Sequence, residues 1–435
     1  MASSQAPGGG AAALPRRVLV LGAGGREHAL VRAISRSGAR PTVWAAPGNP
    51  GIARDGARCV AIDPLDPDAV CELARRERID FVVVGPEAPL VAGIADALAE
   101  AGVRCLGPSR AAARVEGSKA DAKRLMEQAG VPTARYEILE SHDAALARLP
   151  QLSYPAVFKA DALAAGKGVI IAQDEDQARQ ALDAYFVERR FGETTVLLEE
   201  YLEGEELSLL CLCDGERALP LAPARDYKRL LDGDEGPNTG GMGSYSPVPE
   251  IGPDLLREIV ATVHQPIVDA LRAQGTPYHG VLYGGLMLTD AGVRVLEFNC
   301  RFGDPETQAL LPRMASDLLE LLWRASFPGG LADAECRFEE LAAVCVVLAA
   351  AGYPESPRKG DVIEGVEAAE ALGAEVFHAG TAVRDGQLVT AGGRVLNVVG
   401  LGDDLAIARQ RAYAAADRID FPGKQLRRDI AAGRG

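Results

Sequence analysis

The alternation of short apolar runs with glycine- or proline-rich turns is the feature that most restricts the fold of residues 17–116. The run "RRVLVLGAGGREH" leads into helical spacing, and "PTVWAAPGNPG", "DFVVVGPEAPL" and "VRCLGPS" repeat the pattern around alanine-rich helical segments at 68–78 and 91–101. Such alternation predicts a parallel sheet with helices on both faces and with its loops gathered at the carboxyl ends of the strands. We therefore expect a Rossmann-like N-terminal domain at 17–116.

The rest of the 435-residue chain has a different pattern, and a chain of this length is expected to form roughly two to four domains. Residues 117–330 contain a helix at 118–129, paired strands and a long helix at 253–273, which predicts an α+β body built on antiparallel strands. Residues 331–435 predict a small mixed sheet with a closing helix at 403–418, and residues 1–16 a disordered tail. The predicted fold class is α/β and α+β multidomain.

Charge and cysteine usage exclude several classes of protein. The formal net charge of −15 repels polyanions, so no nucleic-acid partner is expected. No run of 18 apolar residues occurs and the opening "MASSQAPGGGAAALPRR" lacks the order of a signal peptide, so neither a membrane span nor secretion is expected. The spacing of Cys211 and Cys213 along one strand suits neither a disulfide nor zinc, which favours buried thiols in a reducing, cytoplasmic compartment.

Residues 22–28, "GAGGREH", form a glycine turn between a strand and a helix. A dinucleotide fingerprint needs a third glycine where Glu27 stands and an acidic residue at the end of the second strand, where Trp44-Ala45-Ala46 stands, so NAD binding is disfavoured. A helix N-terminus still accepts a phosphate, and Arg26 can add charge-assisted hydrogen bonds. A tight turn that binds nothing is the alternative.

Two further turns, "PGNPG" at 47–51 and "GPEAPL" at 85–90, follow the neighbouring strands. Three polar turns at one edge of a sheet together predict a ligand site. Glu87 could accept hydrogen bonds from sugar hydroxyls there, or could be a solvated turn carboxylate.

The stretch "KADALAAGKGVIIA", residues 159–172, places two lysines and two glycines in an apparent β-hairpin. A Walker loop would need glycine at Asp161 and serine or threonine at Gly168, so this is no P-loop. The alternatives are a flexible hairpin over ATP phosphates, with Lys159 and Lys167 meeting them, and an exposed basic turn.

The segment "LEEYLEGEEL", residues 198–207, follows a predicted strand. As an inter-domain hinge it could offer backbone groups at Tyr201 and Leu202 to an adenine, while Glu206 accepts both ribose hydroxyls. The alternative is a solvated acidic loop.

The segment "VRVLEFNCRFGDPETQ", residues 293–308, carries the most specific pattern. Alternate residues of a strand share a face, so Glu297 and Asn299 point the same way and offer two oxygen donors that suit Mg²⁺. Arg301 and Asp304 follow on a loop, where a guanidinium can hold a carboxylate or phosphate. A hydrogen-bonded edge-strand pair is the alternative. The glycine-rich segment 232–247 is too long for a plain connection, which favours a binding loop.

Taken in this order, these segments resemble the phosphoribosylamine–glycine ligase family of ATP-grasp enzymes. The resemblance runs from about residue 17 to 430 and rests on ordered strings, among them "GAGGREHAL", "APGNPG", "VVVGPEAPL", "EGSKA", "KADALAAGKGV", "EEYLEGEE", "GPNTGGMGSYSP", "EFNCRFGDPETQ" and "VFHAGT". It implies that ATP, 5-phosphoribosylamine and glycine give the glycinamide ribonucleotide, ADP and phosphate. It also implies an ATP-grasp body with a mobile lid at about 133–195, a C-terminal mixed α/β domain, and Mg²⁺ or Mn²⁺ as the cation.

The resemblance assigns roles by position. The residues implied to bind ATP are Lys119, Lys159, Gly166, Lys167, Gly168, Glu199, Tyr201, Leu202 and Glu206. Those implied to bind the other substrates are Gly24, Gly25, Arg26, Glu27, Asn49, Gly51, Glu87, Asp226, Asn238, Thr239 and Gly240. The implied catalytic residues are Arg301, Asp304, Lys228 and Arg229, and the implied metal ligands are Glu297 and Asn299.

The sequence departs from the family's usual pattern at three positions, with Ala162 for glycine, Tyr227 for histidine and Ser244 for alanine. No implied catalytic lysine, arginine or metal ligand is missing. The rival hypotheses are an ATP-grasp ligase acting on another ribonucleotide, an NAD-dependent oxidoreductase, and a regulatory ATP-binding module without catalysis.

Overall fold

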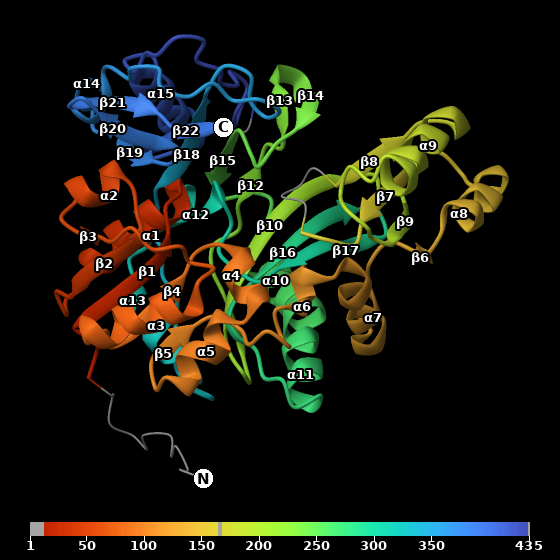
Figure 1. Ribbon diagram of the computed structural model, residues 1–435, viewed down its shortest axis with the longest axis horizontal. Coiled ribbons are helices and arrows are strands. Elements are labelled where there is room, and N and C mark those ends of the chain that lie inside the picture. The colour runs from red at the N-terminus through yellow and green to blue at the C-terminus, as the bar shows by residue number, and fades with distance from the viewer. Residues whose placement is uncertain (1–12, 164–167, 434–435) are drawn as a thin grey trace.

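The computed structural model describes residues 13–163 and 168–433 (Figure 1). Its first sheet, the N-terminal sheet, has the strand order β3-β2-β1-β4-β5 with every ladder parallel, as the sequence predicts. The apolar residues of its central strands are buried because helices cover both faces, which is typical of parallel sheets. Its strands are β1 (Arg17–Gly22), β2 (Thr42–Pro47), β3 (Arg58–Cys59), β4 (Phe81–Val84) and β5 (Arg104–Leu106). Its helices are α1 (Gly25–Ser35), α2 (Pro50–Arg54), α3 (Pro67–Arg76), α4 (Glu87–Ala92), α5 (Ile94–Glu100) and α6 (Arg114–Gly117).

Two antiparallel sheets follow, in agreement with the predicted α+β body. The lid sheet has the order β6-β9-β7-β8, and the central sheet has the order β11-β10-β16-β17. The stretch 159–172 is a hairpin in which β7 pairs with β8, while its turn at 164–167 lies outside the described residues. The lid-sheet strands are β6 (Tyr136–Leu139), β7 (Ala156–Ala160), β8 (Val169–Ala172) and β9 (Val196–Glu200). The central-sheet strands are β10 (Glu205–Asp214), β11 (Ala218–Pro220), β16 (His279–Thr289) and β17 (Gly292–Asn299).

The last sheet, the C-terminal sheet, differs from the sequence expectation in two ways. Its order is β12-β15-β18-β22-β19 and all of these ladders are antiparallel, so the predicted mixed pairing is wrong. Its strands β12 (Arg225–Asp226) and β15 (Gly243–Ser246) come from the middle of the chain and pair beside β18 (Ala342–Ala349). The remaining strands are β19 (Glu375–His378) and β22 (Arg394–Gly402). Residues 232–247, expected to be a loop, include strands because β15 finds its partner about a hundred residues later.

Two small hairpins stand apart from the larger sheets. They are formed by β13 (Arg229–Leu231) with β14 (Glu235–Asn238), and by β20 (Thr381–Arg384) with β21 (Gln387–Thr390). The remaining helices are α7 (Lys119–Ala129), α8 (His142–Arg148), α9 (Glu175–Leu182), α10 (Pro253–Ile259), α11 (Gln265–Ala273), α12 (Glu306–Leu310), α13 (Leu318–Ala325), α14 (Val366–Glu370) and α15 (Leu405–Ala416). In the described part of the chain, no helix has both the length and the apolarity needed to cross a bilayer.

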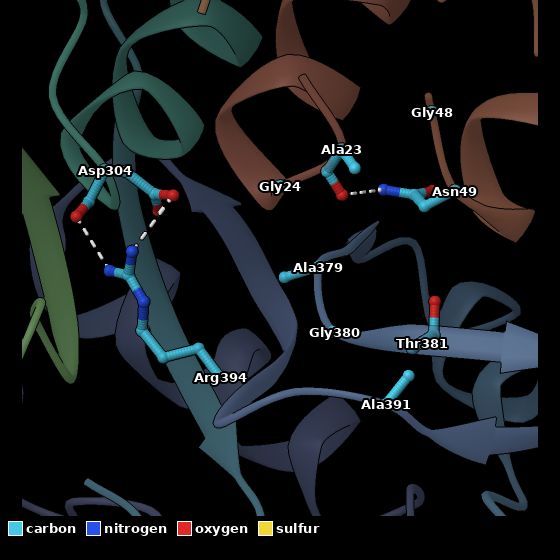
Figure 2. Close-up of a pocket in the computed structure, with 10 residues that line it drawn as sticks. All are labelled: Ala23, Gly24, Gly48, Asn49, Asp304, Ala379, Gly380, Thr381, Ala391 and Arg394. Carbon is cyan, nitrogen blue, oxygen red and sulfur yellow. Dashed lines mark hydrogen bonds and ion pairs between the residues drawn. The ribbon is translucent and has the colours of Figure 1, made fainter. Parts of the chain in front are cut away.

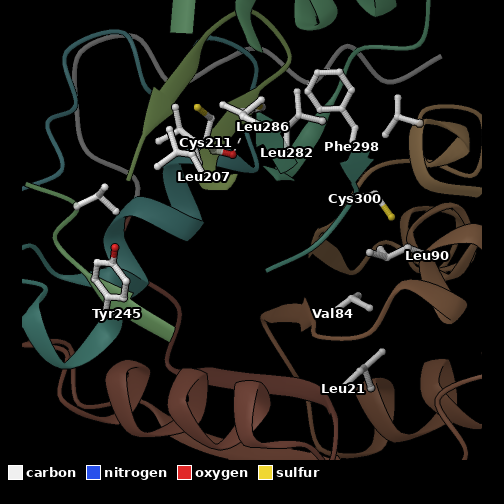
Figure 3. Packing of buried hydrophobic residues seen from close by; sticks show 14 of the residues in the cluster. Leu21, Val84, Leu90, Leu207, Cys211, Tyr245, Leu282, Leu286, Phe298 and Cys300 are labelled. Carbon is white, nitrogen blue, oxygen red and sulfur yellow. Dashed lines mark hydrogen bonds between the residues drawn. The ribbon is translucent and has the colours of Figure 1, made fainter. Parts of the chain in front are cut away.

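One buried cluster joins the N-terminal, central and C-terminal sheets. Figure 3 shows Leu21 and Val84 from the first, Leu282 and Phe298 from the second, and Tyr245 from the third. The lid sheet has a separate apolar core of its own, around Phe158 and Leu198. The apolar side chains of the lid sheet therefore pack mainly against one another and the helices beside them.

All eight cysteines lie within the described residues and are free thiols. Cys211, Cys213, Cys300 and Cys345 are buried, as expected. Cys59 is exposed, because the short β3 lies at the edge of the N-terminal sheet.

Candidate functional site

A pocket of about 400 Å³ lies where the N-terminal sheet meets the C-terminal sheet (Figure 2). The turns after β1 and β2 form one wall, because adjacent parallel strands end at the same edge of a sheet. Residues around β20 and β22 form the other wall. The residues that line the pocket are Ala23, Gly24, Gly48, Asn49, Asp304, Ala379, Gly380, Thr381, Ala391 and Arg394.

Glu27 serves as a helix cap inside the 22–28 turn. Its Oε2 accepts a hydrogen bond from the Gly24 N–H at 2.5 Å, and its Oε1 accepts one from Arg26 Nε at 2.6 Å. A side chain at Gly85 would collide with this carboxylate, so the glycine of the 85–90 turn leaves room for Glu27. Arg26 is buried and donates from Nη1 to the Phe302 carbonyl at 3.1 Å. In this structure both charged residues stabilise the turn that presents Gly24 to the pocket.

Asn49 links the two walls of the pocket. Its Oδ1 accepts from the Ile52 N–H at 3.0 Å and so caps α2, while its Nδ2 donates to the carbonyls of Ala23 and His378, both at 2.9 Å. Gly51 lies against the imidazole rings of His28 and His378, where a Cβ would collide with both. Asn49 and Gly51, which the resemblance implies bind substrate, therefore bring the two walls of the pocket together.

Arg394 supplies the positive charge of the pocket, and the sequence motifs did not single it out. Its Nη2 lies 3.0 Å from Asp304 Oδ2, and its Nη1 donates to the carbonyls of Asp304 at 2.7 Å and Gly240 at 2.5 Å. Burial disfavours the Asp304 carboxylate, but the nearby Arg394 outweighs it and holds the pKa of Asp304 below its usual value. Gly25 is nearby but packs against Asn397. The pocket thus has a fixed guanidinium, a group that forms charge-assisted hydrogen bonds with anionic ligands.

Two buried histidines support the pocket from behind. His28 Nδ1 accepts from the His378 N–H at 2.8 Å, and His378 Nδ1 lies 3.1 Å from the Thr381 hydroxyl. Burial lowers the pKa of His378 to about 3 and also lowers the pKa of His28. Both rings are therefore neutral at physiological pH.

The neutral state of His378 predicts an acid-sensitive fold. Between pH 6.5 and about 4 the unfolded chain binds a proton at this residue that the folded chain does not, so the free energy of unfolding falls as pH falls, by about 1.4 kcal/mol per pH unit for the residue. His378→Gln should reduce this pH slope by that amount in urea denaturation. Thr381→Val, which removes the hydrogen-bond partner and keeps the titrating ring, should lower stability without changing the slope. Equal slopes for all three proteins would contradict this assignment.

A second cluster of charges surrounds Glu297 on β17. Burial disfavours its carboxylate, but Lys228, Lys159 and Lys119 together outweigh this and lower its pKa. Asn299, on the same face, donates from Nδ2 to Glu297 Oε1 at 3.4 Å. The predicted pair is therefore brought together: the ionised carboxylate faces the amide nitrogen of Asn299, whose oxygen accepts from Arg301 Nη2 at 3.3 Å. The pair offers carboxylate and amide oxygens as donors. This donor chemistry fits a hard divalent cation whose remaining ligands come from phosphates and water.

The lysines of this cluster come from three separate segments. Lys119, at the start of α7, donates to the carbonyls of Ala160 at 3.1 Å and Ala162 at 2.8 Å. Lys159 on β7 donates to Glu199 Oε2 at 3.0 Å and to the Leu296 carbonyl at 3.2 Å. Gly168, at the described end of the hairpin turn, accepts from Ala160 N at 2.8 Å. The predicted residues Gly166 and Lys167 lie outside the described residues.

Lys228 lies on the opposite side of the cluster between two acids. It is paired with Glu206 and lies 3.3 Å from Asp226 Oδ1. Burial disfavours its ammonium, but Asp226 and Glu206 outweigh burial and hold the pKa of Lys228 well above its usual range. Burial raises the pKa of Asp226 to about 7. Glu206, expected to bind ribose, is engaged by Lys228 in this structure.

Residues 229–240, which follow Lys228, connect the charges around Glu297 with the pocket beside Arg394. Arg229 donates from Nη1 to the Gly236 carbonyl at 2.7 Å, so its guanidinium lies within the β13–β14 hairpin. Asn238 pairs with Arg229 across that hairpin, and Thr239 donates to the Lys228 carbonyl from its backbone N at 2.7 Å and its hydroxyl at 2.8 Å. Gly240 then offers its carbonyl to the guanidinium described above.

Arg301 joins the turn at Glu87 to the Asn299 amide. Its Nε lies 3.3 Å from Glu87 Oε2, and its Nη2 lies 3.3 Å from both Glu116 Oε1 and Asn299 Oδ1. Burial disfavours the guanidinium, but Glu116 and Glu87 outweigh it and raise the pKa of Arg301. Glu116, which the sequence motifs did not single out, also accepts from the Cys300 N–H at 2.7 Å. Glu87 is therefore an ion-paired residue and not a solvated turn carboxylate.

The hinge segment lies at the junction of the lid and central sheets. Glu199 on β9 is buried and its Oε2 accepts from both Lys123 and Lys159. Tyr201 and Leu202 follow β9 outside any helix or strand, with the Tyr201 side chain exposed. Lys123 is another residue that no motif indicated.

Each of the three residues that depart from the family pattern makes a defined contact in this structure. Ala162 accepts through its carbonyl from Lys119 at 2.8 Å. Tyr227 packs its ring 4.9 Å from the Arg427 guanidinium and accepts from the Ala431 N–H at 2.9 Å. The Ser244 hydroxyl donates to the Pro305 carbonyl at 2.8 Å.

Three segments of the chain match the domains of phosphoribosylglycinamide synthetase. The N domain matches residues 16–116, the ATP-grasp (A) domain residues 117–307 and the C domain residues 343–433. A phosphoribosylamine–glycine ligase of Mesorhizobium japonicum is 50% identical over 415 residues, covering 95% of this chain and 97% of the relative. One of Streptomyces coelicolor is 51% identical over 420 residues, covering 96% of this chain and 99% of the relative. The crystal structure of the phosphoribosylamine–glycine ligase of Thermotoga maritima superposes with a TM-score of 0.83 at 37% identity, covering 95% of this chain and 100% of that one.

Proposed function

This chain belongs to the phosphoribosylglycinamide synthetase family and is an ATP-grasp ligase of purine synthesis, and we propose that it joins glycine to 5-phospho-D-ribosylamine through a glycyl phosphate. The products are N1-(5-phospho-D-ribosyl)glycinamide, ADP and phosphate. The single observation that carries this proposal is the presence of two groups of basic side chains. Lys119, Lys159 and Lys228 surround Glu297, and Arg394 lies beside Asp304.

The proposed division of the chain follows from these two clusters. Residues 17–116 present the sugar amine, residues 117–330 bind ATP, with the lid at about 133–195, and residues 331–435 close the sugar pocket. Strands β12 and β15 support this closure because they join the ATP-binding segment to the C-terminal sheet. The protein is proposed to act on small metabolites, without a nucleic-acid partner, in the cytoplasm.

ATP is proposed to lie between the lid sheet and the central sheet. The ATP phosphates would contact Lys119, Lys159 and Lys167, together with Gly166 and Gly168. The nucleoside would be held by Glu199, Tyr201, Leu202 and Glu206. Glu206 would have to break its ion pair with Lys228 to bind ribose. Nucleotide binding would therefore leave the Lys228 ammonium able to pair with the triphosphate. Glu297 and Asn299 would hold a divalent cation, proposed to be Mg²⁺ or Mn²⁺, which neutralises phosphate charge when bound.

The sugar amine is proposed to occupy the pocket beside Arg394. Its phosphate would meet the guanidinium and lie against the backbone of the Gly24 and Asn49 turns, with the backbone of 238–240 alongside. Its amine would then point toward Asp304 and Arg301. These two residues lie on the segment that connects the pocket to β17.

The chemistry follows from the weak electrophilicity of a carboxylate. An oxygen of the glycine carboxylate attacks the γ-phosphorus of ATP, the bond to the β–γ bridging oxygen breaks, and ADP leaves. The sugar amine then attacks the acyl carbon, an amide bond forms, and phosphate leaves with loss of a proton from nitrogen. Phosphoryl transfer needs mainly positioning and neutralisation of spread charge, which Lys119, Lys159, Lys228 and Arg301 can supply. An acyl phosphate hydrolyses readily, so a lid that excludes water is needed.

The direct test mixes the full chain with ATP, Mg²⁺, glycine and freshly generated 5-phosphoribosylamine and measures ADP. Release of ADP that requires both acceptor substrates is expected. ADP release with another ribonucleotide and without glycine would point to a different ATP-grasp ligase. If no ADP is released with both substrates present, the ligase proposal is wrong and a regulatory ATP-binding module without catalysis is supported instead.

The pocket assignment predicts a selective defect when Arg394 loses its charge. Arg394→Met should raise the KM for 5-phosphoribosylamine at least about tenfold, because a charge-assisted contact to phosphate is lost, on the order of 1.5–3 kcal/mol. The KM for ATP should stay within about twofold. Arg384→Met, on the β20–β21 hairpin outside the pocket lining, is the matched control. A rise in the KM for ATP alone would contradict the assignment.

A further inference from the structure

Lys123 is a buried cation that the mechanism above does not use. It lies on α7, its side chain is 2% exposed, and burial lowers the pKa of its amine to about 8. A buried ammonium is costly unless it is paired and hydrogen-bonded. Its partners are Glu199 Oε2 at 2.9 Å and the Thr133 hydroxyl at 2.7 Å.

The two oxygens of Glu199 are in different situations. Oε2 accepts from Lys123 at 2.9 Å and from Lys159 at 3.0 Å. Oε1 is equally buried and has no hydrogen-bond donor within the ranges 13–163 and 168–433. A buried carboxylate oxygen without a donor is expensive, and a ligand that brings an N–H group would satisfy it.

The surrounding contacts hold this carboxylate rigidly between two sheets. The Thr133 hydroxyl accepts a hydrogen bond from the Lys123 ammonium and donates one to the Val295 carbonyl on β17 at 2.6 Å. Lys159 donates to the neighbouring Leu296 carbonyl at 3.2 Å. The Glu199 side chain is therefore tied to β17 from both sides and has little freedom to rotate.

We infer that Lys123 is a positioning residue that fixes Glu199 so that its free oxygen accepts a hydrogen bond from the exocyclic amino group of adenine. This inference rests on the proposed ATP site. In an adenine joined to ribose, the exocyclic amino group is the only N–H donor, and a carboxylate can only accept. A base with a carbonyl oxygen at that position would face the carboxylate lone pairs and be rejected. Lys123 thus contributes to the choice of nucleobase without touching the nucleotide.

The experiment compares ATP with purine riboside 5′-triphosphate, which lacks only the amino group. Both are titrated calorimetrically into the full chain with Mg²⁺. The wild-type protein should bind ATP at least about tenfold more tightly, as expected for a hydrogen bond to a charged acceptor. In Lys123→Met this ratio should fall below about threefold, and Thr133→Val should lower it to a smaller extent. Arg124→Met, the exposed neighbour on the same helix, should keep the wild-type ratio.

A purely structural role for Lys123 would weaken both nucleotides equally, and an unchanged ratio in Lys123→Met would therefore overturn the inference. If Lys123→Met does not fold, Lys123→Gln and Thr133→Val decide the question by the same ratio. A wild-type ratio near one would also overturn it, because Glu199 would then not recognise the amino group. That result would leave the ligase reaction intact, whereas a lack of ADP release with glycine and the sugar amine would contradict the proposed function itself.

Discussion

Glu297→Ala is expected to lower kcat at least about a thousandfold in the presence of Mg²⁺ while the fold persists. The carboxylate is the charged member of the proposed cation site, and its removal leaves Lys119, Lys159 and Lys228 facing each other without it. Removal of a single hydrogen-bond donor that stabilises charge developing in a transition state already lowers kcat on the order of 10²–10³. Coupled measurement of ADP release, together with circular dichroism, checks both parts of this expectation.

Asp254→Ala provides the control for Glu297→Ala, because Asp254 is an acid on the exposed start of α10 whose side chain is 94% exposed. This variant should keep full activity. Glu297→Gln keeps the shape of the side chain and loses its charge, so it should resemble Glu297→Ala if charge is what matters. Full activity of Glu297→Ala with Mg²⁺ would remove the metal assignment.

Arg301→Lys is expected to lower kcat by about a hundredfold with little loss of stability. The guanidinium touches Glu87, Glu116 and Asn299 at once, all at 3.3 Å. Lysine keeps the charge but lacks the planar fork, so the Asn299 amide and the Glu87 turn lose their common anchor. A misplacement of about 1 Å at a reacting centre costs on the order of 10² in rate.

Arg301→Met separates positioning from stability. It leaves the Glu87 and Glu116 carboxylates without their shared cation, and breaking such a buried pair costs about 3–5 kcal/mol. Urea denaturation measures this loss, and Arg257→Met, with a side chain that is 72% exposed, should show almost none. Retention of wild-type kcat in Arg301→Lys would show that the segment is positioned by other contacts.

The elements that sequence reasoning predicted well are those specified by local patterns. The parallel N-terminal sheet follows from repeated strand–turn–helix units, and the Glu297–Asn299 pair follows from the two-residue period of a strand. The lid hairpin was likewise predicted from a short run on each side of a glycine turn. In each case the determining residues are near neighbours in the chain.

The residues that sequence reasoning missed have their partners far along the chain. Lys123 and Glu199 are 76 residues apart, Glu116 and Cys300 are 184 apart, and Arg394 and Asp304 are 90 apart. Nothing next to Lys123 or Arg394 distinguishes either residue from an ordinary charged surface position. Glu27, which the resemblance implies binds substrate, makes the contacts of a helix cap in this structure.

The path of β12 and β15 bears on how such an enzyme can be rearranged in evolution. Strands β12 and β15 belong to the proposed ATP-binding segment, but they pair into the C-terminal sheet. The other strands of that sheet come much later in the chain, after the proposed ATP-binding segment has ended. Removal of the final hundred residues would leave β15 with an open edge, and open edges invite association with other chains. The terminal segment is thus interlaced with its predecessor, and exchange of whole modules between relatives would have to move both together.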